Sequence, residues 1–406
     1  MAEKDINLYA PNSWLEEESK AKQKAVKLPS HLRIYNQTPI TDEITQKMLT
    51  PKQMFLDVDA KNIATTQLNP KRTPKGYYSE LVLEIEDPET IAELYKEKAR
   101  RNRQYRKDLV TEGKRDFDFF KNSALVCQST SKLFDFIMIK ISETGVFLWD
   151  DNEFEEKAPS FFDKALKFSI DEYIDLLGKK DRKTVRETIK LDLEILKRQR
   201  FYCTTFAPNK EPQTWTSISL FGGTLEIPAR GRYINLKINS DFIRVMRYYK
   251  YQTGLFYQFF DIEALRGNEN KNPMYYAMFK KLLSHRRINI KREKNQQMKI
   301  SVKALAEYCK QHLPTYEEVK AHGNKISQRI LEPFERDLKA IANTGSLTYK
   351  FVNKDNVEKI PTTYQEWIES DLLITWKYPY PNVKQLQEGI KKNSKKSTKK
   401  DTKENQ

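Results

Sequence analysis

A serine-capped amphipathic helix occurs twice in this chain, each time at the same place in a longer series of predicted elements. The first copy, FSIDEYIDLLG, places Ser169 at the helix N-cap, Glu172 three residues later as in a capping box, and Gly178 at the stop. The second copy, ISVKALAEYC, places Ser301 at the N-cap and apolar residues at helical spacing behind it. Such a recurrence favours two units of one architecture.

The elements around the first copy follow a simple order. A buried helix, Ser131–Ile141, precedes it, and a third helix of about residues 181–199 follows. The apolar period then changes from that of a helix to that of a strand. Three strands are predicted, at Phe201–Phe206, Thr214–Leu220 and Arg232–Ile238. Three helices followed by a small sheet is the order of a winged-helix domain.

The second copy has similar surroundings. A helix at Met274–Ser284 precedes it, and a third helix spans about residues 325–342 before Gly345. Two strands, Ser346–Val352 and Leu372–Tyr378, are joined by a long connection, residues 353–371. We therefore predict an α+β protein with two tandem winged-helix domains, residues 116–250 and 251–380.

The two ends of the chain differ from these domains. Residues 1–115 read as a poorly packed, partly disordered extension with a short strand at Leu81–Ile85 and a charged helix at about residues 89–110. Residues 381–406 form a lysine-rich tail that we expect to be disordered.

The charge of the chain indicates what it binds. The 406 residues carry a formal net charge of +16, which attracts nucleic acid first and an anionic membrane surface second. The alternative is that the positive charge only keeps the protein soluble and has no specific partner. The sequence has no apolar run near the roughly 18 residues of a membrane span and no secretory signal. Its three cysteines lie far apart, as in a reduced intracellular protein, so we expect a cytoplasmic protein without membrane contact.

The third helix of the second domain has the design of a DNA-recognition helix. One face is apolar, with Ile326, Ile330, Phe334, Leu338 and Ile341. The opposite face, interrupted only by Glu332, holds the candidate DNA-binding residues Lys325, Gln328, Arg329, Arg336 and Lys339. Gln328 and Arg329 are candidates for base contacts and the other three for phosphates or flanking bases. An ordinary amphipathic helix with a solvated basic face would look the same.

The third helix of the first domain is less uniform. Its candidate DNA contacts are Lys183, Arg186 and Lys190, close to two glutamates, and a second apolar strip, Leu191 and Ile195, flanks the main one. A helix that is apolar on two sides is packed on two sides. An inter-domain or dimer contact is therefore as good an interpretation as DNA binding.

A basic segment between the first two helices of the second domain is a candidate phosphate clamp. Exposed loops also carry such charge without a ligand. The candidate residues are Arg286, Arg287, Lys291 and Arg292.

The sequence offers no candidate catalytic residue, metal site or cofactor site. It lacks a phosphate-binding G-x-x-x-x-G-K-[S/T] motif, a His-x-His pair for a nicking enzyme, and zinc-ligand spacing of its cysteines. Acidic pairs such as Asp116 with Asp118 are better read as caps or solvated loops. We expect a binding protein and not an enzyme.

Several phrases between about residues 120 and 352 resemble the replication initiators of iteron-containing theta plasmids. They are SKLFDFIMIKIS, FSIDEYIDLLG, RYINLKIN followed by SDF, YQTGLFYQFFDIEALRGNENKNPMYYAMFKKLL and SQRILEPFERDL. Their order and spacing carry the resemblance. The extension of residues 1–115 and the insert of residues 353–371 depart from the family pattern.

This resemblance implies a function. The second domain would read repeated origin sequences in double-stranded DNA, and the first would dimerise and contact the DNA backbone. Monomers would open the origin, dimers would repress the protein's own gene, and the host initiator and replicative helicase would be partners. A winged-helix transcriptional regulator that binds a palindromic operator is the alternative, followed by a nickase or primase and by a DNA-coating protein.

Overall fold

The computed structural model describes the helices, strands and short loops of the chain. These are residues 31–38, 41, 42, 45, 78–85, 116–149, 151–163, 166–179, 181–197, 199–206, 212–226, 233–244, 246, 257–266, 271–289, 296–309, 312–321, 323 and 325–380. Helices and small antiparallel sheets are mixed along them, so the fold is α+β. Several predicted features lie outside these residues: the charged helix at 89–110, the lysine-rich tail, and Lys291 with Arg292.

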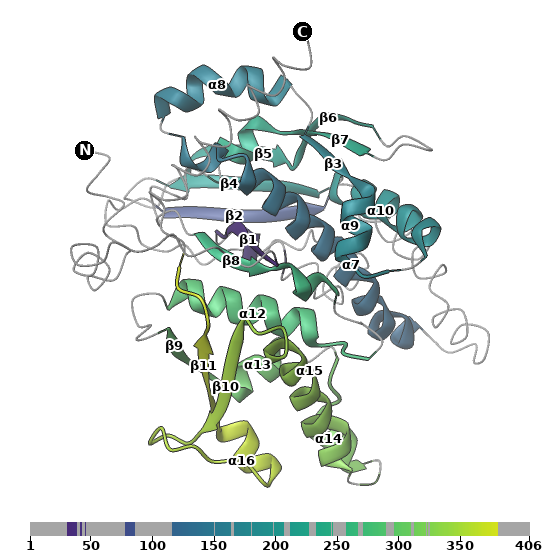
Figure 1. The fold of residues 1–406 in the computed structure, drawn as a ribbon, viewed down its shortest axis with the longest axis vertical. Helices are drawn as coiled ribbons and strands as arrows, with labels where there is room; N and C mark the ends of the chain where they lie inside the picture. The colour runs from purple at the N-terminus through teal and green to yellow at the C-terminus, as the bar shows by residue number, and fades with distance from the viewer. Residues whose placement is uncertain are drawn as a thin grey trace.

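The elements from residue 116 to residue 238 form a first unit, in the upper half of Figure 1. Its long first helix confirms the predicted buried helix, and its later elements confirm the predicted third helix and strands. In order, the elements are α7 (Asp116–Glu143), η1 (Val146–Leu148), α8 (Asp151–Asp163), β3 (Leu166–Ser169), α9 (Ile170–Leu176), α10 (Arg182–Lys197), β4 (Gln199–Phe206), β5 (Pro212–Ser219), β6 (Phe221–Glu226) and β7 (Tyr233–Ile238).

The elements from residue 275 to residue 376 form a second unit, below the first in Figure 1. They are α12 (Tyr275–Ile288), β9 (Gln297–Ser301), α13 (Val302–Tyr308), α14 (Tyr316–Ala321), η4 (Ser327–Leu331), α15 (Glu332–Ala342), β10 (Leu347–Val352), α16 (Tyr364–Glu369) and β11 (Asp371–Trp376). Helix α12 runs beyond the predicted end at Ser284, and β9 was not predicted. The stretch interpreted as a basic loop is therefore shorter than expected.

The two units share a topology. In the first, β3 leads into α9 and the sheet order is β3-β7-β6; in the second, β9 leads into α13 and the order is β9-β11-β10. All of these neighbours are antiparallel. In each sheet the strand before the serine-capped helix pairs with the last strand of its unit.

The predicted helix caps are confirmed in both units. Ser169 accepts a hydrogen bond from the backbone N–H of Glu172 at 3.2 Å, and Ser301 accepts one from Ala304 at 3.2 Å. Each bond satisfies one of the N–H groups that a helix leaves free in its first turn. The Glu172 carboxylate does not complete a capping box, because it pairs with Lys140 of α7 at 2.6 Å.

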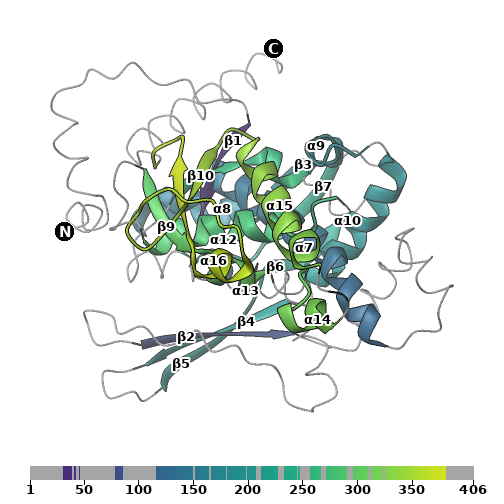
Figure 2. The ribbon, with the colours of Figure 1, turned by 90° about the horizontal axis from the view of Figure 1, so that it is seen from below.

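A short strand before residue 115 corrects the expectation that the extension is poorly packed. β1 (Leu32–Asn36) pairs antiparallel with β8 (Tyr257–Asp261), which leads into η2 (Ile262–Arg266). Tyr35 is fully buried, because β1 passes between the two units and packs on α7. The strand predicted at Leu81–Ile85 is confirmed as part of β2 (Tyr78–Ile85), which pairs with β4 in a β2-β4-β5 sheet on one side of the molecule (Figure 2).

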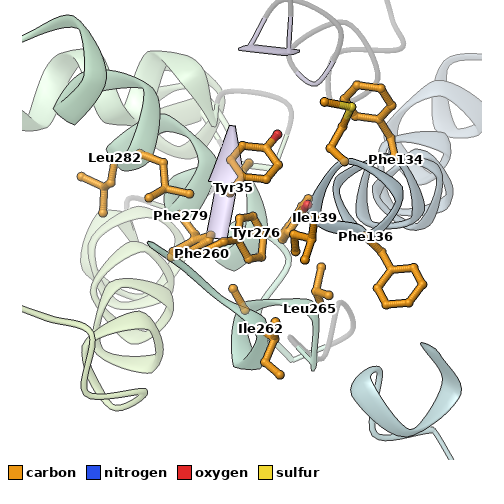
Figure 3. Packing of buried hydrophobic residues seen from close by; sticks show 14 of the residues in the cluster. Tyr35, Phe134, Phe136, Ile139, Phe260, Ile262, Leu265, Tyr276, Phe279 and Leu282 are labelled. Carbon is orange, nitrogen blue, oxygen red and sulfur yellow. The ribbon is translucent and has the colours of Figure 1, made fainter. Parts of the chain in front are cut away.

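A buried polar cluster joins β1, α7 and α12. Asp135 of α7 is inaccessible to solvent and accepts hydrogen bonds from Tyr35 at 2.5 Å, from Lys280 at 2.8 Å and from Tyr276. Burial, reinforced by the carboxylate, raises the pKa of both tyrosines well above the ordinary value, so both hydroxyls keep their proton and donate. Figure 3 shows two members of the cluster, Tyr35 and Tyr276, among buried aromatic and aliphatic side chains of α7, α12, β8 and η2. One continuous core therefore connects the two units.

Candidate nucleic-acid interface

The third helix of the second unit is built from η4 and α15 and docks through its apolar face, as predicted. Ile330, Phe334, Leu338 and Ile341 are buried, and Ile326 is half-buried against the same core. Phe334 packs edge-on against Trp367 of α16 at a centroid distance of 5.0 Å. Since this face holds the helix against its own unit, the opposite face is presented to solvent.

All five predicted DNA-binding residues of this helix are exposed: Lys325, Gln328, Arg329, Arg336 and Lys339. They are not equally free. Arg336 donates from Nε to Asp337 at 3.1 Å, and Lys339 pairs with Glu335 at 3.1 Å. Lys325 and Arg329 form no ion pair with any residue that the structure describes. The cations at the start of the helix are thus the ones open to a ligand.

Asp337 anchors this helix, a role that the sequence pattern did not predict. Its side chain is inaccessible to solvent and accepts the backbone N–H of Met274 at 2.7 Å and the Asn272 amide at 2.9 Å, both just before α12. Desolvation raises the pKa of this carboxyl, although the donors around it act in the opposite direction. The signal in the sequence was a single acid beside the apolar face of an amphipathic helix.

The helix begins with a wide turn. Residues Ser327–Leu331 are π-helical, and the N–H of Glu332 bonds to the carbonyl of Ser327, five residues back. Pro333 follows in the first turn of α15. A proline inside a helix disturbs the turn that precedes it, and here an enlarged turn lies directly before Pro333.

The hairpin after the helix is rich in charge that is already paired. Lys350 of β10 pairs with Glu358 at 2.7 Å, and Lys359 pairs with Glu366 of α16 at 2.6 Å. Hydrogen bonds from Lys359 and Thr362 lower the pKa of Glu366 to about 2. The insert between the strands is thus an ordered connection in which Lys359 is already paired.

An open hollow lies beside the helix between α15 and the start of α12. Its lining is Asn272, Glu332, Glu335, Arg336, Lys339, Ala340 and Asn343. Two acids balance two bases there, so the hollow concentrates no positive charge.

The candidate phosphate clamp is wrong for Arg286, which lies inside the molecule. Arg286 is in the last turn of α12, is 2% exposed and donates to the carbonyl of Tyr378 at 3.0 Å. Its guanidinium lies over the rings of Trp376 and Tyr380, at 4.7 Å and 4.1 Å from their centroids. An arginine engaged in this way stabilises the packing of the chain after β11 on α12 and is not available to phosphate.

Arg287, the second member of that clamp, is also engaged. It pairs with Asp42 at 2.8 Å, and both side chains are largely buried. Ser284 donates to the same carboxylate at 2.9 Å. The pair ties the stretch after β1 to the end of α12.

The third helix of the first unit, α10, carries its predicted cations in a different setting. Lys183 is exposed, while Arg186 lies 3.5 Å from Asp171 and Lys190 lies 3.5 Å from Glu187. Ile195, from the second apolar strip, is fully buried, and Leu191 is half-buried. Ile195 therefore packs as the two-sided interpretation of this helix predicted.

The described residues include no group of three or more histidine, cysteine or acidic side chains that could hold a metal ion. Cys309 is buried, and burial raises the pKa of its thiol, which disfavours the reactive thiolate. None of the helices that the structure describes combines the length and apolar character that crossing a bilayer requires.

Comparisons with known proteins place two solved structures beside this chain. Domains 2 and 3 of RctB match with 10% sequence identity and a TM-score of 0.34, over 82% of this chain and 99% of the other. A second structure of RctB domains 2–3 matches with 12% identity and a TM-score of 0.33, over 79% of this chain and 96% of the other. Identity and TM-scores at this level assign neither fold nor function. No protein-family description and no curated protein matches the sequence.

Proposed function

We propose that this chain is a sequence-specific double-stranded DNA-binding protein that initiates replication, and that it acts by binding and not by catalysis. The observation that carries this proposal is the exposed face at the start of the third helix of the second unit. Lys325, Gln328 and Arg329 are exposed at the start of a helix whose apolar face is buried in the core of its own unit. Arginine and glutamine recognise guanine and adenine edges through paired hydrogen bonds.

The arrangement of each unit supports a tandem winged-helix interpretation. A helix, a strand, a capped helix, a further long helix and a returning hairpin occur in this order in both units, with α8, β4 and β5 added in the first unit and α14 and α16 in the second. In a winged-helix domain the third helix enters the major groove and the hairpin flanks it. The net charge of +16 supports a polyanionic partner.

The choice of replication initiation among DNA-binding functions rests on the resemblance in sequence to iteron-binding plasmid initiators. Under this proposal the second unit reads the origin repeats, and the first serves dimerisation and backbone contacts. The protein exchanges between homodimer and monomer, recruits the host initiator and replicative helicase, works in the cytoplasm, and needs no cofactor.

DNase protection across the DNA that flanks the protein's own gene, at near-physiological salt, tests this function. Regularly spaced protection over direct repeats is expected of the initiator. A single palindromic footprint would indicate a transcriptional regulator instead. Diffuse protection would support only non-specific DNA binding. Magnesium-dependent cleavage or primer synthesis by the purified protein would contradict the non-catalytic part.

A further inference from the structure

The wide turn at the start of the recognition helix has a local cause in Pro333. In a regular α-helix the ring of Pro333 would clash with the carbonyl of Arg329, four residues back, and its missing N–H would leave that carbonyl without a partner. The bond from Glu332 to Ser327 encloses one extra residue. A turn enlarged in this way moves the Arg329 carbonyl away from the ring.

The apolar face of the helix fits the same turn. Ile326, Ile330, Phe334 and Leu338 recur every four residues. A regular helix turns by about 100° per residue, so a four-residue repeat drifts around it by about 40° at each step. The wide turn takes up this drift, and Ile330 stays only 3% exposed, next to the fully buried Phe334.

The polar face changes as a consequence. One extra residue in the turn rotates the residues before it, relative to those after it, by up to about 100°, the angle of one residue. Gln328 and Arg329 precede Pro333, whereas Arg336 and Lys339 follow it. The two groups thus point in directions that a uniform helix would not give them.

We propose that Pro333 is a specificity-determining positioning residue: through the π-helical turn it fixes which base pairs Gln328 and Arg329 read relative to the DNA bound by Arg336 and Lys339. Pro333 itself needs no contact with DNA. This inference rests on the proposed function, because it assumes that this helix reads DNA.

The test is selection from a library of random double-stranded DNA, carried out with the full-length wild-type chain and with Pro333→Ala. In Pro333→Ala the new N–H can bond to the Arg329 carbonyl, and the turn becomes α-helical. Discrimination should fall roughly ten- to a hundredfold at the base pairs that Arg329→Ala identifies as read by Arg329. Affinity for random DNA and its salt dependence should stay the same, since the number of cations is unchanged.

A second variant restores the direction of the side chains by another route. Pro333→Ala combined with deletion of Leu331 removes the extra residue, so a continuous α-helix again directs Gln328 and Arg329 close to their original angle. This variant should regain the wild-type site. Pro314→Ala, a proline replacement before α14 in the same unit, is the matched control and should leave the selected site unchanged, and thermal unfolding verifies that each variant is folded.

The outcomes separate the two proposals. If the wild-type chain enriches no sequence, the proposed function fails, and the positioning role fails with it. If the wild-type chain enriches a site, and Pro333→Ala enriches the same site with the same preference among bases, only the role of Pro333 is wrong. Failure of the deletion to rescue specificity would also overturn that role, because direction would then not be what the turn controls.

Discussion

The third helices of the two units share an internal anchor. Each contains an aspartate, a leucine next to it and an aliphatic residue three positions further on, at Asp192–Leu196 and Asp337–Ile341. Both aspartates are buried. Asp192 accepts a hydrogen bond from Thr130 of α7 at 2.6 Å, and Asp337 accepts the N–H of Met274, next to α12, at 2.7 Å. Each helix is thus tied to the first helix of its own unit, or to the residues just before it, in the same way.

The outer faces of these helices differ. On α10, Arg182 pairs with Asp171 at 2.7 Å and with Asp175 at 3.1 Å, and Arg186 also lies beside Asp171. On the later helix, Lys325 and Arg329 form no ion pair with any described residue. Under the proposed function, the features that the units share serve folding, and those that distinguish them serve binding. The four predictions below test this division, beginning with the largest effect.

The largest effect is expected where the two units meet. Asp135→Ala would leave the buried ammonium of Lys280 without its carboxylate, and removing one partner of a buried pair costs about 3–5 kcal/mol. Urea unfolding at neutral pH should show this loss. Because the cluster joins α7 to α12, the variant should also separate the unfolding of the two units.

The matched control is Glu143→Ala on the same helix. Glu143 is about one-third exposed and pairs with Lys140 at 3.5 Å, so its removal should change stability by less than about 1 kcal/mol. The apolar double substitution Asp135→Leu with Lys280→Met should recover much of the loss. A loss from Asp135→Ala no larger than that from Glu143→Ala would show that the cluster does not join the units.

The second prediction distinguishes the units by pH. Of the described histidines, His285 and His312 lie in the second unit and His31 lies just before β1, so the first unit contains none. The Nε2 atom of His312 is buried without a hydrogen-bond partner, and burial lowers the pKa of this side chain to about 4. In the unfolded chain His312 binds a proton below about pH 6.5, whereas in the folded chain it does so only near pH 4. The free energy of unfolding should therefore be highest above pH 6.5 and fall by about 1–3 kcal/mol as the pH decreases towards 4.

Hydrogen exchange at pH 7 and pH 5, corrected for intrinsic rates, would detect this loss. Amides of α12 and α13 should lose protection before those of α7 and α10. His312→Leu should reduce the difference, since the ring makes no hydrogen bond from Nε2. Earlier loss in α7 would assign the acid sensitivity to the first unit instead.

Local patterns in the sequence predicted the elements that depend on neighbours along the chain. Ser169, Ser301 and Gly178 have the roles expected of them, because caps and helix stops are decided within a few residues. The third helix of the second unit was located for the same reason. Its periodicity even identified which side chains are exposed.

Other features depend on contacts between distant segments, and the sequence patterns did not predict them. Tyr35 and Asp135 are 100 residues apart, and Arg286 is covered by the rings of Trp376 at the end of β11 and of Tyr380 beyond it. A cation near the end of a helix looks the same in the sequence whether it meets phosphate or a tryptophan. The assumption of a uniform helix likewise concealed the wide turn before Pro333.

The third prediction compares the two anchors. Asp337→Ala leaves a buried backbone N–H without an acceptor, which costs about 1–3 kcal/mol, whereas Asp192→Ala frees hydroxyl groups that can rotate to other partners and should cost less. Chemical denaturation of both variants measures the difference. Equal losses of stability would show that accepting a backbone N–H does not make Asp337 more important to the fold than Asp192.

The last prediction compares exposed cations on the two third helices, and the smallest effect of all is expected for the cation of α10. Arg329→Ala should lower affinity for the selected DNA site by about 1–3 kcal/mol and affinity for random DNA much less, because a base contact contributes only at the correct base. Lys183→Ala, an exposed cation of α10, should weaken both by the same small factor and reduce the salt dependence by about one counterion. Gel shifts on both DNAs over a salt series separate these outcomes. An equal loss for Arg329→Ala on random DNA would make its side chain a phosphate contact, and the two helices would then differ in how many cations are free but not in what they recognise.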